Sequence, residues 1–196
     1  NQVIGHAAGH VTEVLESIDY LTGKFREPLM HQVVVALCAE LLCLGRLASN
    51  QSEAAAKVKQ VLANGAAAEK FARMVSALGG PNDLMEKPDK HLKYAPLKQT
   101  VYADEAGYVA SMNSREIGLS IIQLGGGRKV ASDVVDHSVG YADFCKVGDV
   151  VDAHKPLATI YANDEDSLKA AAKTLKQNIE ISQKTVEIPP AIVKKL

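Results

Sequence analysis

The chain has 196 residues, of which 47% are hydrophobic and 23% charged, and its formal net charge is -1. This length suits one or two domains with a substantial core, and the composition is that of a globular protein. A charge so close to zero excludes a global field that would attract nucleic acid or an anionic membrane surface. No apolar run approaches the roughly 18 residues that a transmembrane helix needs, and residues 1–6 lack the pattern of a signal peptide. We therefore expect a cytoplasmic protein with no nucleic-acid or membrane partner.

The first eighty residues have the apolar spacing of helices. Apolar side chains recur every three or four residues over 9–21, and Gly23 is placed to end that helix. A second helix over 28–44 is apolar nearly all round, so we expect it to lie at the centre of the core. Third and fourth helices are predicted over 52–64 and 66–78. On the fourth, four residues are expected to face inward: Phe71, Met74, Val75 and Leu78.

Prolines and charges over 81–96 indicate a connecting segment, after which the pattern changes to β. Beyond it we expect strands at 100–103 and 108–112 about a hairpin-like turn at 104–107, a helix over 117–124, strands at 150–151 and 156–161, and a helix over 164–182. Ile179 is expected on the inward face of that last helix. The predicted fold class is α+β: a helical part over 1–80, the connecting segment 81–96, and a sandwich-like β/α module over 97–196.

The three cysteines, Cys38, Cys43 and Cys145, are odd in number and form no C-x-x-C pair. A disulfide framework and a zinc site are therefore both disfavoured. We expect these residues to be small buried hydrophobic side chains.

Residues 147–160 resemble the barrel-sandwich hairpin of lipoyl and biotinyl domains, with Gly148 at the turn and alternate valines facing inward. In those carriers the modified lysine follows the final strand within about four or five residues. This sequence has Asp164 and Glu165 there. A carboxylate cannot form the amide that carries the cofactor, so the pattern predicts the fold and argues against a swinging-arm carrier.

The run Gly125-Gly126-Gly127-Arg128 has two interpretations. A phosphate-binding loop needs glycines that lead into the N-terminus of a helix, where free N–H groups converge. Here the run follows a predicted helix, and it lacks the Lys-Ser/Thr ending of a Walker loop. We favour helix termination and close backbone packing over anion binding.

Other titratable groups are weak candidates for a site. His10 and Glu13 lie three apart on one predicted helix face, which allows a metal site, but a solvated helix N-terminus is the favoured interpretation. Asp136 and His137 are adjacent, and adjacent residues rarely face each other as an acid/base pair. No serine or cysteine nucleophile with a spaced partner stands out.

Several stretches share an order and spacing that extend over essentially the whole chain. They are Asn1-Gln2-Val3, Ala8-Gly9-His10, Glu13-Val14, Tyr20-Leu21-Thr22-Gly23, Ala36-Leu37-Cys38, Asn64-Gly65-Ala66-Ala67, Phe71 through Met74, Val101-Tyr102-Ala103-Asp104, Leu124-Gly125-Gly126-Gly127-Arg128, Ala131-Ser132-Asp133, Asp136, Ser138-Val139-Gly140, Gly148-Asp149 and Pro156-Leu157-Ala158. Together they resemble the thymidine and pyrimidine-nucleoside phosphorylase family, and the bacterial thymidine phosphorylases look closest.

The resemblance implies reversible phosphorolysis of thymidine to thymine and 2-deoxyribose 1-phosphate in pyrimidine nucleoside salvage. The family fold has a helical domain hinged to a larger α/β domain, with the active site in the cleft between them. Cleft closure brings phosphate to the nucleoside, so catalysis depends on positioning. The implied partners are thymidine and phosphate as co-substrate, with no organic cofactor, and family members are homodimers.

The resemblance also implies that the chain corresponds only to the C-terminal part of such an enzyme. Residues 1–80 then belong to the helical portion of the large α/β domain. The phosphate loop, the base-contacting residues and the dimer helices lie in an N-terminal half, which becomes the partner of this piece. No catalytic or substrate-binding residue is therefore expected in this chain, and alone it is expected to be inactive.

One site of the family carries over by resemblance. Some members bind a monovalent cation near the phosphate, and the matching ligands are the carbonyls of Ile4 and Ala7 and the carboxylate of Glu16. Two alternatives stay open beside the leading interpretation: a stand-alone structural or regulatory module, and a fragment of a relative that acts on another nucleoside or nucleotide.

Overall fold

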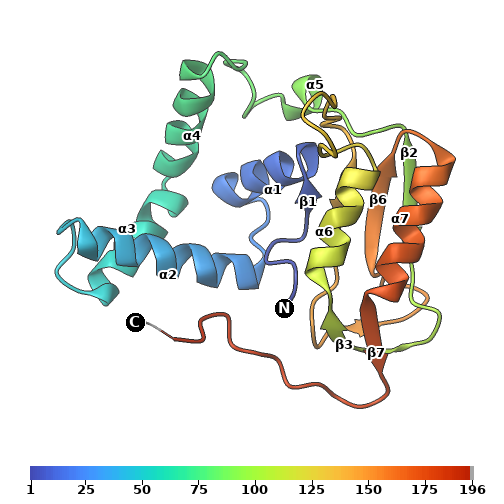
Figure 1. Cartoon of the computed structure of the whole chain (residues 1–196). Helices are drawn as coiled ribbons and strands as arrows, with labels where there is room; N and C mark the ends of the chain where they lie inside the picture. Colours follow the sequence, from blue (N-terminus) through green and yellow to red (C-terminus); the bar gives the residue numbers. More distant parts are fainter. Residues whose placement is uncertain (195–196) are drawn as a thin grey trace. The chain divides into compact units, whose positions relative to one another are not determined.

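The computed structural model describes residues 1–194, and the chain forms two compact units. The sheet unit contains Asn1–Val14 and Leu92–Pro189, and the helical unit contains Leu15–His91 with the tail from Pro190. The α+β class predicted from the sequence is confirmed, because the chain combines helices with two antiparallel sheets (Figure 1). None of the helices in residues 1–194 has both the length and the apolar character that a membrane span requires.

The helices of the helical unit begin at recognisable local signals. α2 (Pro28–Leu44) has proline at its first position, and the Glu27 carboxylate accepts a hydrogen bond from the Met30 amide at 2.7 Å. α3 (Gln51–Ala63) begins at Asn50, whose side chain accepts from the Glu53 amide at 2.9 Å. The other helices are α1 (Val11–Thr22), which contains the boundary between the units, α4 (Ala66–Ala77) and α5 (Pro88–His91).

The core of the helical unit is small and centres on Tyr20, Val58 and Leu62. The Arg26 guanidinium donates to the backbone oxygens of Tyr20 at 2.9 Å and Leu62 at 3.0 Å, which joins the end of α1 to the end of α3. Burial raises the pKa of the Tyr20 hydroxyl, while the positive charge of Arg26 acts in the opposite direction.

The prediction that α2 lies at the centre of the core is wrong. Only one residue of this helix is buried, whereas Leu37, Leu41 and Leu44 are 61%, 67% and 71% exposed. α3 packs along one side of α2, and the three leucines lie where no residue of 1–194 covers them. The inward face predicted for α4 holds only in part, since Phe71 and Val75 are half-buried whereas Met74 and Leu78 are exposed. An apolar sequence indicates that a helix packs against another element. It does not show that this element belongs to the same chain.

The sheet unit contains two antiparallel sheets, with strand orders β1-β4-β6-β2 and β5-β3-β7. The strands of the first sheet are β1 (Ala8–Gly9), β4 (Gly140–Ala142), β6 (Ala158–Ala162) and β2 (Leu97–Val101). Those of the second are β5 (Val150–Val151), β3 (Gly107–Met112) and β7 (Ile179–Ser182). Two helices, α6 (Ser114–Gln123) and α7 (Glu165–Gln177), pack against each other, and α7 also packs on β6.

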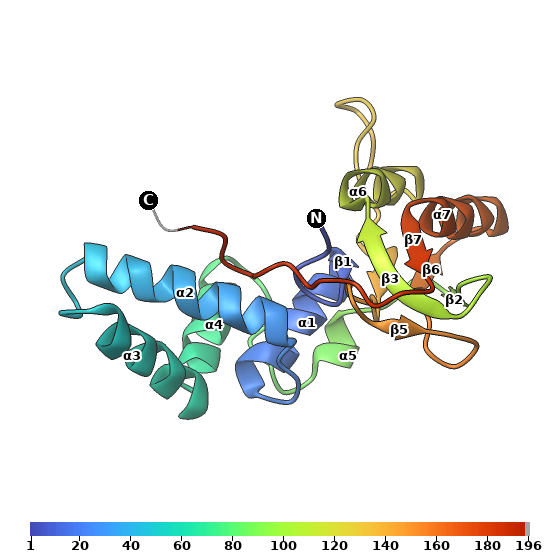
Figure 2. The same cartoon turned by 90° about the horizontal axis from the view of Figure 1, so that it is seen from below.

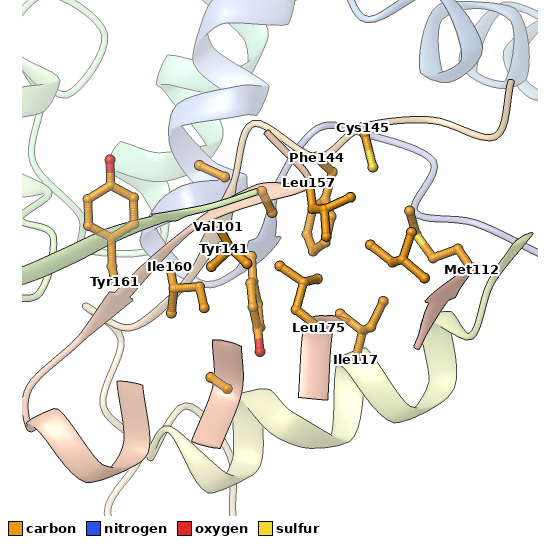
Figure 3. Packing of buried hydrophobic residues seen from close by; sticks show 14 of the residues in the cluster. Val101, Met112, Ile117, Tyr141, Phe144, Cys145, Leu157, Ile160, Tyr161 and Leu175 are labelled. Atoms are coloured by element: carbon orange, nitrogen blue, oxygen red, sulfur yellow. The ribbon is translucent and has the colours of Figure 1, made fainter. Parts of the chain in front are cut away.

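Tyr141 lies at the centre of the core of this unit. Figure 3 shows its ring pointing from β4 towards the helices, among Ile117, Ile160 and Leu175. The buried Tyr141 hydroxyl is hydrogen-bonded to Ser120 Oγ on α6, so neither polar atom is left without a partner. Burial raises the pKa of Tyr141 to about 12, and the hydrogen bond to Ser120 acts in the opposite direction.

Two predictions about the β region are wrong. The segment 104–107 is not a hairpin turn, because β2 pairs with β6 in one sheet while β3 pairs with β5 and β7 in the other. The last helix also stops earlier than predicted, since Asn178 caps α7 and Ile179 pairs with Met112 as part of β7. β2 and β3 pair with strands that lie far away in the sequence. Local turn signals and apolar periodicity therefore could not predict their partners.

The first strand belongs to the sheet unit, because Ala8 pairs with Tyr141 and Gly9 pairs with Gly140. The compact units therefore divide the chain differently from the predicted domains. The first fourteen residues, which the sequence placed with the helices, fold with the C-terminal module.

Candidate functional site

Three stretches that are far apart in the sequence meet at the first turn of α1. Gly9 of β1 lies opposite Gly140 of β4, and both have positive φ, at 136° and 151°. His10 follows Gly9, and its Nε2 is hydrogen-bonded to the carbonyl oxygen of Gly126 at 2.8 Å. The His10 ring also meets the His137 ring edge-on, with centroids 4.6 Å apart. This contact region, which we call the glycine node, contains Gly9-His10, Gly125-Gly126 and His137-Gly140.

The glycine run ends α6 and permits close packing. The amides of Gly125 and Gly126 donate to the carbonyls of Ile122 and Ile121 at 3.1 and 2.9 Å, and Gly125 has φ +96°. A Cβ on Gly126 would lie 2.7 Å from the Ile121 side chain and 3.1 Å from that of Val139. The predicted role in helix termination and close packing is confirmed.

The loop that follows the run binds its own backbone. The Asp136 amide donates to the Gly125 carbonyl at 2.9 Å and closes the loop at its base. The Asp133 carboxylate accepts from the Lys129 amide at 2.9 Å, and Arg128 Nε donates to the Asp133 carbonyl at 3.2 Å. Figure 2 shows this loop projecting beyond α6. These polar groups therefore stabilise the loop itself.

Glu13 forms a local contact at the helix start rather than a pair with His10. Its Oε1 accepts from the Gly9 amide at 2.9 Å, which is the arrangement of an N-terminal cap. Within residues 1–194, no group of three or more His, Cys, Asp or Glu side chains is arranged to hold a metal ion. This geometry supports the interpretation of a solvated helix N-terminus.

Asp136 is engaged by its neighbours and not by His137. Its carboxylate accepts from the Ser138 amide at 2.9 Å, from the Ser138 hydroxyl at 2.6 Å, and from the Asn163 side-chain amide. Partial burial raises the pKa of Asp136, but these hydrogen bonds and the nearby His137 outweigh that effect, so the pKa lies below its usual value. A carboxylate held in this way anchors the loop and is a poor proton acceptor.

The position of the carrier lysine is occupied by the cap of α7. Asp164 accepts hydrogen bonds from the Ser167 amide at 2.8 Å and the Ser167 hydroxyl at 2.7 Å, and these bonds lower its pKa. The chain therefore uses this turn to begin a helix.

The cysteines are free thiols. Cys38 and Cys43 are half-buried, whereas Cys145 is 3% exposed in the core of the sheet unit. Burial, and secondarily the charge of Asp149, raises the pKa of the Cys145 thiol to about 12. Cys145 thus fits the predicted role of a small buried side chain most closely.

The three residues of the predicted cation site have oxygen donors, which suit a hard monovalent ion. Ala7 and Glu16 are 6% and 7% exposed. The Ile4 carbonyl, however, already accepts a hydrogen bond from the ammonium of Lys146 at 3.1 Å. A free cation at the Ile4 carbonyl would be repelled by the ammonium of Lys146. Ile4 therefore does not suit a free cation while Lys146 is in place. The binding of a free cation stays a prediction, and sequence reasoning missed Lys146.

The sheet unit is an α+β module, in which the polar side chains at several candidate positions cap helices and anchor loops. Residues 108–182 match the model of a known family, the pyrimidine nucleoside phosphorylase C-terminal domain. The match begins in β3 and ends with β7, its pairing partner. This match supports a relationship of residues 108–182 to the pyrimidine nucleoside phosphorylase family.

Proposed function

We propose that this chain is the C-terminal part of a thymidine phosphorylase. The complete enzyme catalyses reversible phosphorolysis of thymidine to thymine and 2-deoxyribose 1-phosphate in pyrimidine nucleoside salvage. The observation that carries the proposal is the match of residues 108–182 to the C-terminal domain of pyrimidine nucleoside phosphorylases. The resemblance to thymidine phosphorylases over the rest of the chain extends it to a particular nucleoside.

The state of the candidate side chains supports a non-catalytic role for this part. A general base needs a pKa near the working pH and a free path to the proton it removes. Asp136 has a lowered pKa and accepts three hydrogen bonds, and Cys145 is buried with a raised pKa. Neither group is prepared for proton transfer or nucleophilic attack. Their state supports the proposal that the catalytic residues lie outside this chain.

The exposed leucines of α2 support the proposal that another part of the enzyme covers the helical unit. Leu41 and Leu47 line an apolar groove of about 720 Å³ between α2 and α3, with Val58 and Leu62 at its floor. A contiguous apolar surface of this kind usually marks an interface. We assign the upstream half of the same enzyme as its cover, and a homodimer as the complete assembly.

Thymine release from thymidine and phosphate tests the proposal. We expect release by the longer protein that contains this chain, and none by the purified 196-residue chain. Parallel assays with uridine and deoxyuridine measure nucleoside preference. Appreciable turnover by the isolated chain would contradict the claim that the catalytic groups lie elsewhere, and a longer protein inactive on every pyrimidine nucleoside would contradict the function itself.

The same groove favours one second candidate, a stand-alone module that binds another protein. This candidate predicts a 196-residue chain that is a natural product of its gene and has no phosphorolytic parent. Intact-mass measurement of the protein from its source cells separates the two proposals, because only the first requires a longer chain.

A further inference from the structure

The pair Asn64-Gly65 forms the junction between α3 and α4. Asn64 caps the end of α3, Gly65 caps the start of α4, and both residues are exposed. This is the one Asn-Gly pair in the sequence. Each of the other six asparagines is followed by a residue with a side chain, which crowds the backbone nitrogen. They are Asn1, Asn50, Asn82, Asn113, Asn163 and Asn178.

The Asn64 side chain folds back over the peptide that follows it. Its Oδ1 accepts a hydrogen bond from the Ala66 amide at 3.1 Å, which is the two-residue contact of an Asx turn. This bond keeps the side-chain carbonyl beside the Gly65 peptide. An N–H donor on Oδ1 also favours the negative charge that this oxygen gains when a nucleophile adds to Cγ.

The backbone nitrogen of Gly65 is available as that nucleophile. Within residues 1–194 the Gly65 N–H donates no hydrogen bond, so none has to break before it reacts. A Cβ built on Gly65 would meet no atom within 4 Å, so the space around this peptide is open. Asn64 has ψ 2°, and rotation about this bond at a fraying helix end brings the Gly65 nitrogen towards Asn64 Cγ.

We propose that Asn64-Gly65 is a site of spontaneous deamidation in the folded chain. The Gly65 nitrogen loses its proton to a base and attacks Asn64 Cγ. A Cγ–N bond forms, the Cγ–Nδ2 bond breaks, and the leaving group takes up a proton and departs as ammonia. The product is a five-membered succinimide. This inference goes beyond the proposed enzymatic function and does not depend on it.

Water then opens the succinimide at either carbonyl. Opening at Cγ gives aspartate, whereas opening at the backbone carbonyl gives isoaspartate, in which the main chain runs through Cβ and Cγ. Nothing is oxidised or reduced, because the net change is uptake of water and release of ammonia.

The two products differ in their effect on the helical unit. Isoaspartate adds a carbon to the main chain between α3 and α4, next to Leu62 and Ala67, which pack in the small core of this unit. Aspartate leaves the backbone unchanged. Its charge is unfavourable at the C-terminus of α3 and favourable at the N-terminus of α4, so the two effects oppose each other. We therefore expect isoaspartate to destabilise the unit and aspartate to leave its stability nearly unchanged.

Peptide mapping by mass spectrometry, after incubation of the purified chain in mildly alkaline buffer, tests the proposal. We expect deamidation at Asn64 to be at least about tenfold faster than at Asn50, which corresponds to a barrier lower by about 1.4 kcal/mol. Asn50 is the matched asparagine, because it is also exposed and its Oδ1 also accepts from a backbone amide, at 2.9 Å, but Gln51 follows it. Equal rates at the two asparagines would overturn the proposal.

The same incubation in urea gives the rates in the unfolded chain and separates the effect of the sequence from that of the fold. We expect Asn64 to deamidate in both states. If Asn64 reacts in urea but stays intact in the folded chain, the fold protects this pair and the proposal fails.

Gly65→Ala and Gly79→Ala form a matched pair of variants. Both glycines have a left-handed φ, at 81° and 86°, and a Cβ on either would meet no atom within 4 Å, so the conformational cost should be similar. Gly65→Ala should slow deamidation at Asn64 by at least about tenfold, whereas Gly79→Ala should leave the rate unchanged. If both variants deamidate at the rate of the wild type, the assignment of the Gly65 nitrogen is wrong.

Thermal unfolding separates the two products. Asn64→Asp supplies aspartate without isoaspartate and should unfold at the temperature of the wild type. The incubated chain, once enriched in isoaspartate, should unfold at a lower temperature. A wild-type midpoint for the isoaspartate-containing chain would contradict the effect expected of the longer junction.

Discussion

Gly140 lies where two backbones approach closely, and its replacement by alanine is the sharpest test of the fold. A Cβ at this position would lie 2.6 Å from the Ala8 carbonyl oxygen, 3.1 Å from Gly9 Cα and 3.2 Å from Thr12 Oγ1. The first two contacts are with backbone, which cannot rotate away. The φ angle of +151° is also one that a residue with a side chain rarely adopts.

Two costs add for Gly140→Ala. Holding a non-glycine residue in such a conformation costs about 1–3 kcal/mol, and forcing an extra carbon into a packed site costs about 1–3 kcal/mol. We therefore expect a loss of roughly 2–5 kcal/mol in the free energy of unfolding, because partial relaxation relieves some of the clash. A loss of that size is a large part of the stability of an ordinary domain.

Urea denaturation followed by circular dichroism measures the change, as a lower midpoint at an unchanged slope. Gly118→Ala is the control, because Gly118 lies in α6 with no atom within 4 Å of an added Cβ. That change should stabilise the chain by up to about 1 kcal/mol, since alanine is the better helix former. If Gly140→Ala costs less than about 1 kcal/mol, the close approach of β1 and β4 is not as described and the reasoning is refuted.

Three further outcomes follow from burial. The pKa of Tyr141 rises from 10.0 to about 12, so the unfolded chain loses this proton first, and stability present below pH 10 should fall between pH 10 and 12. Tyr141→Phe should reduce the loss in the free energy of unfolding between pH 10 and 12 by up to about 2–3 kcal/mol, measured by denaturation at a series of pH values. An unchanged dependence on pH would contradict the raised pKa of Tyr141. Cys145, buried with a raised pKa, should react with iodoacetamide only after unfolding, whereas the half-buried Cys38 should react in the native chain. Because its apolar groove is uncovered, the isolated chain is expected to self-associate. Leu41→Gln should reduce this self-association in light scattering, while Val134→Ser, at a single exposed loop residue, should not; equal effects would argue against the apolar groove as the interface.

Local signals in the sequence predicted two helix boundaries correctly. Pro28 and Gly23 marked a start and an end that the structure reproduces, because a fixed φ and a left-handed backbone act within one turn. Burial was not predictable in the same way. The leucines of α2 have the pattern of a core helix, but whether a partner covers them depends on chain elsewhere.

Strand partners were the least predictable feature. The turn signal at 104–107 is local, whereas β3 pairs with β7, whose residues are about seventy positions away. Ile179 continues the apolar spacing of α7, so periodicity alone cannot show that Asn178 ends the helix. The contact of Lys146 with residues 3–5 is more distant still and has no motif, because backbone carbonyls carry no sequence signature.

The glycine node shows how stretches that resemble a family can serve the fold of the chain. The separate stretches that resemble the phosphorylases, Gly9-His10, Gly125-Gly126 and Ser138–Gly140, meet in one place through β1–β4 pairing, the His10–Gly126 hydrogen bond and the packing of Gly126 on Val139. The glycine contacts require a residue without a side chain, and the contact with the Gly126 carbonyl requires the N–H donor of His10. None of these contacts presents a free reactive group. Substitutions there should therefore act through stability. In the proposed thymidine phosphorylase, Gly126→Ala should lower the amount of folded protein and leave KM for thymidine unchanged, whereas a substrate-binding role for the run would raise KM at an unchanged yield of folded enzyme.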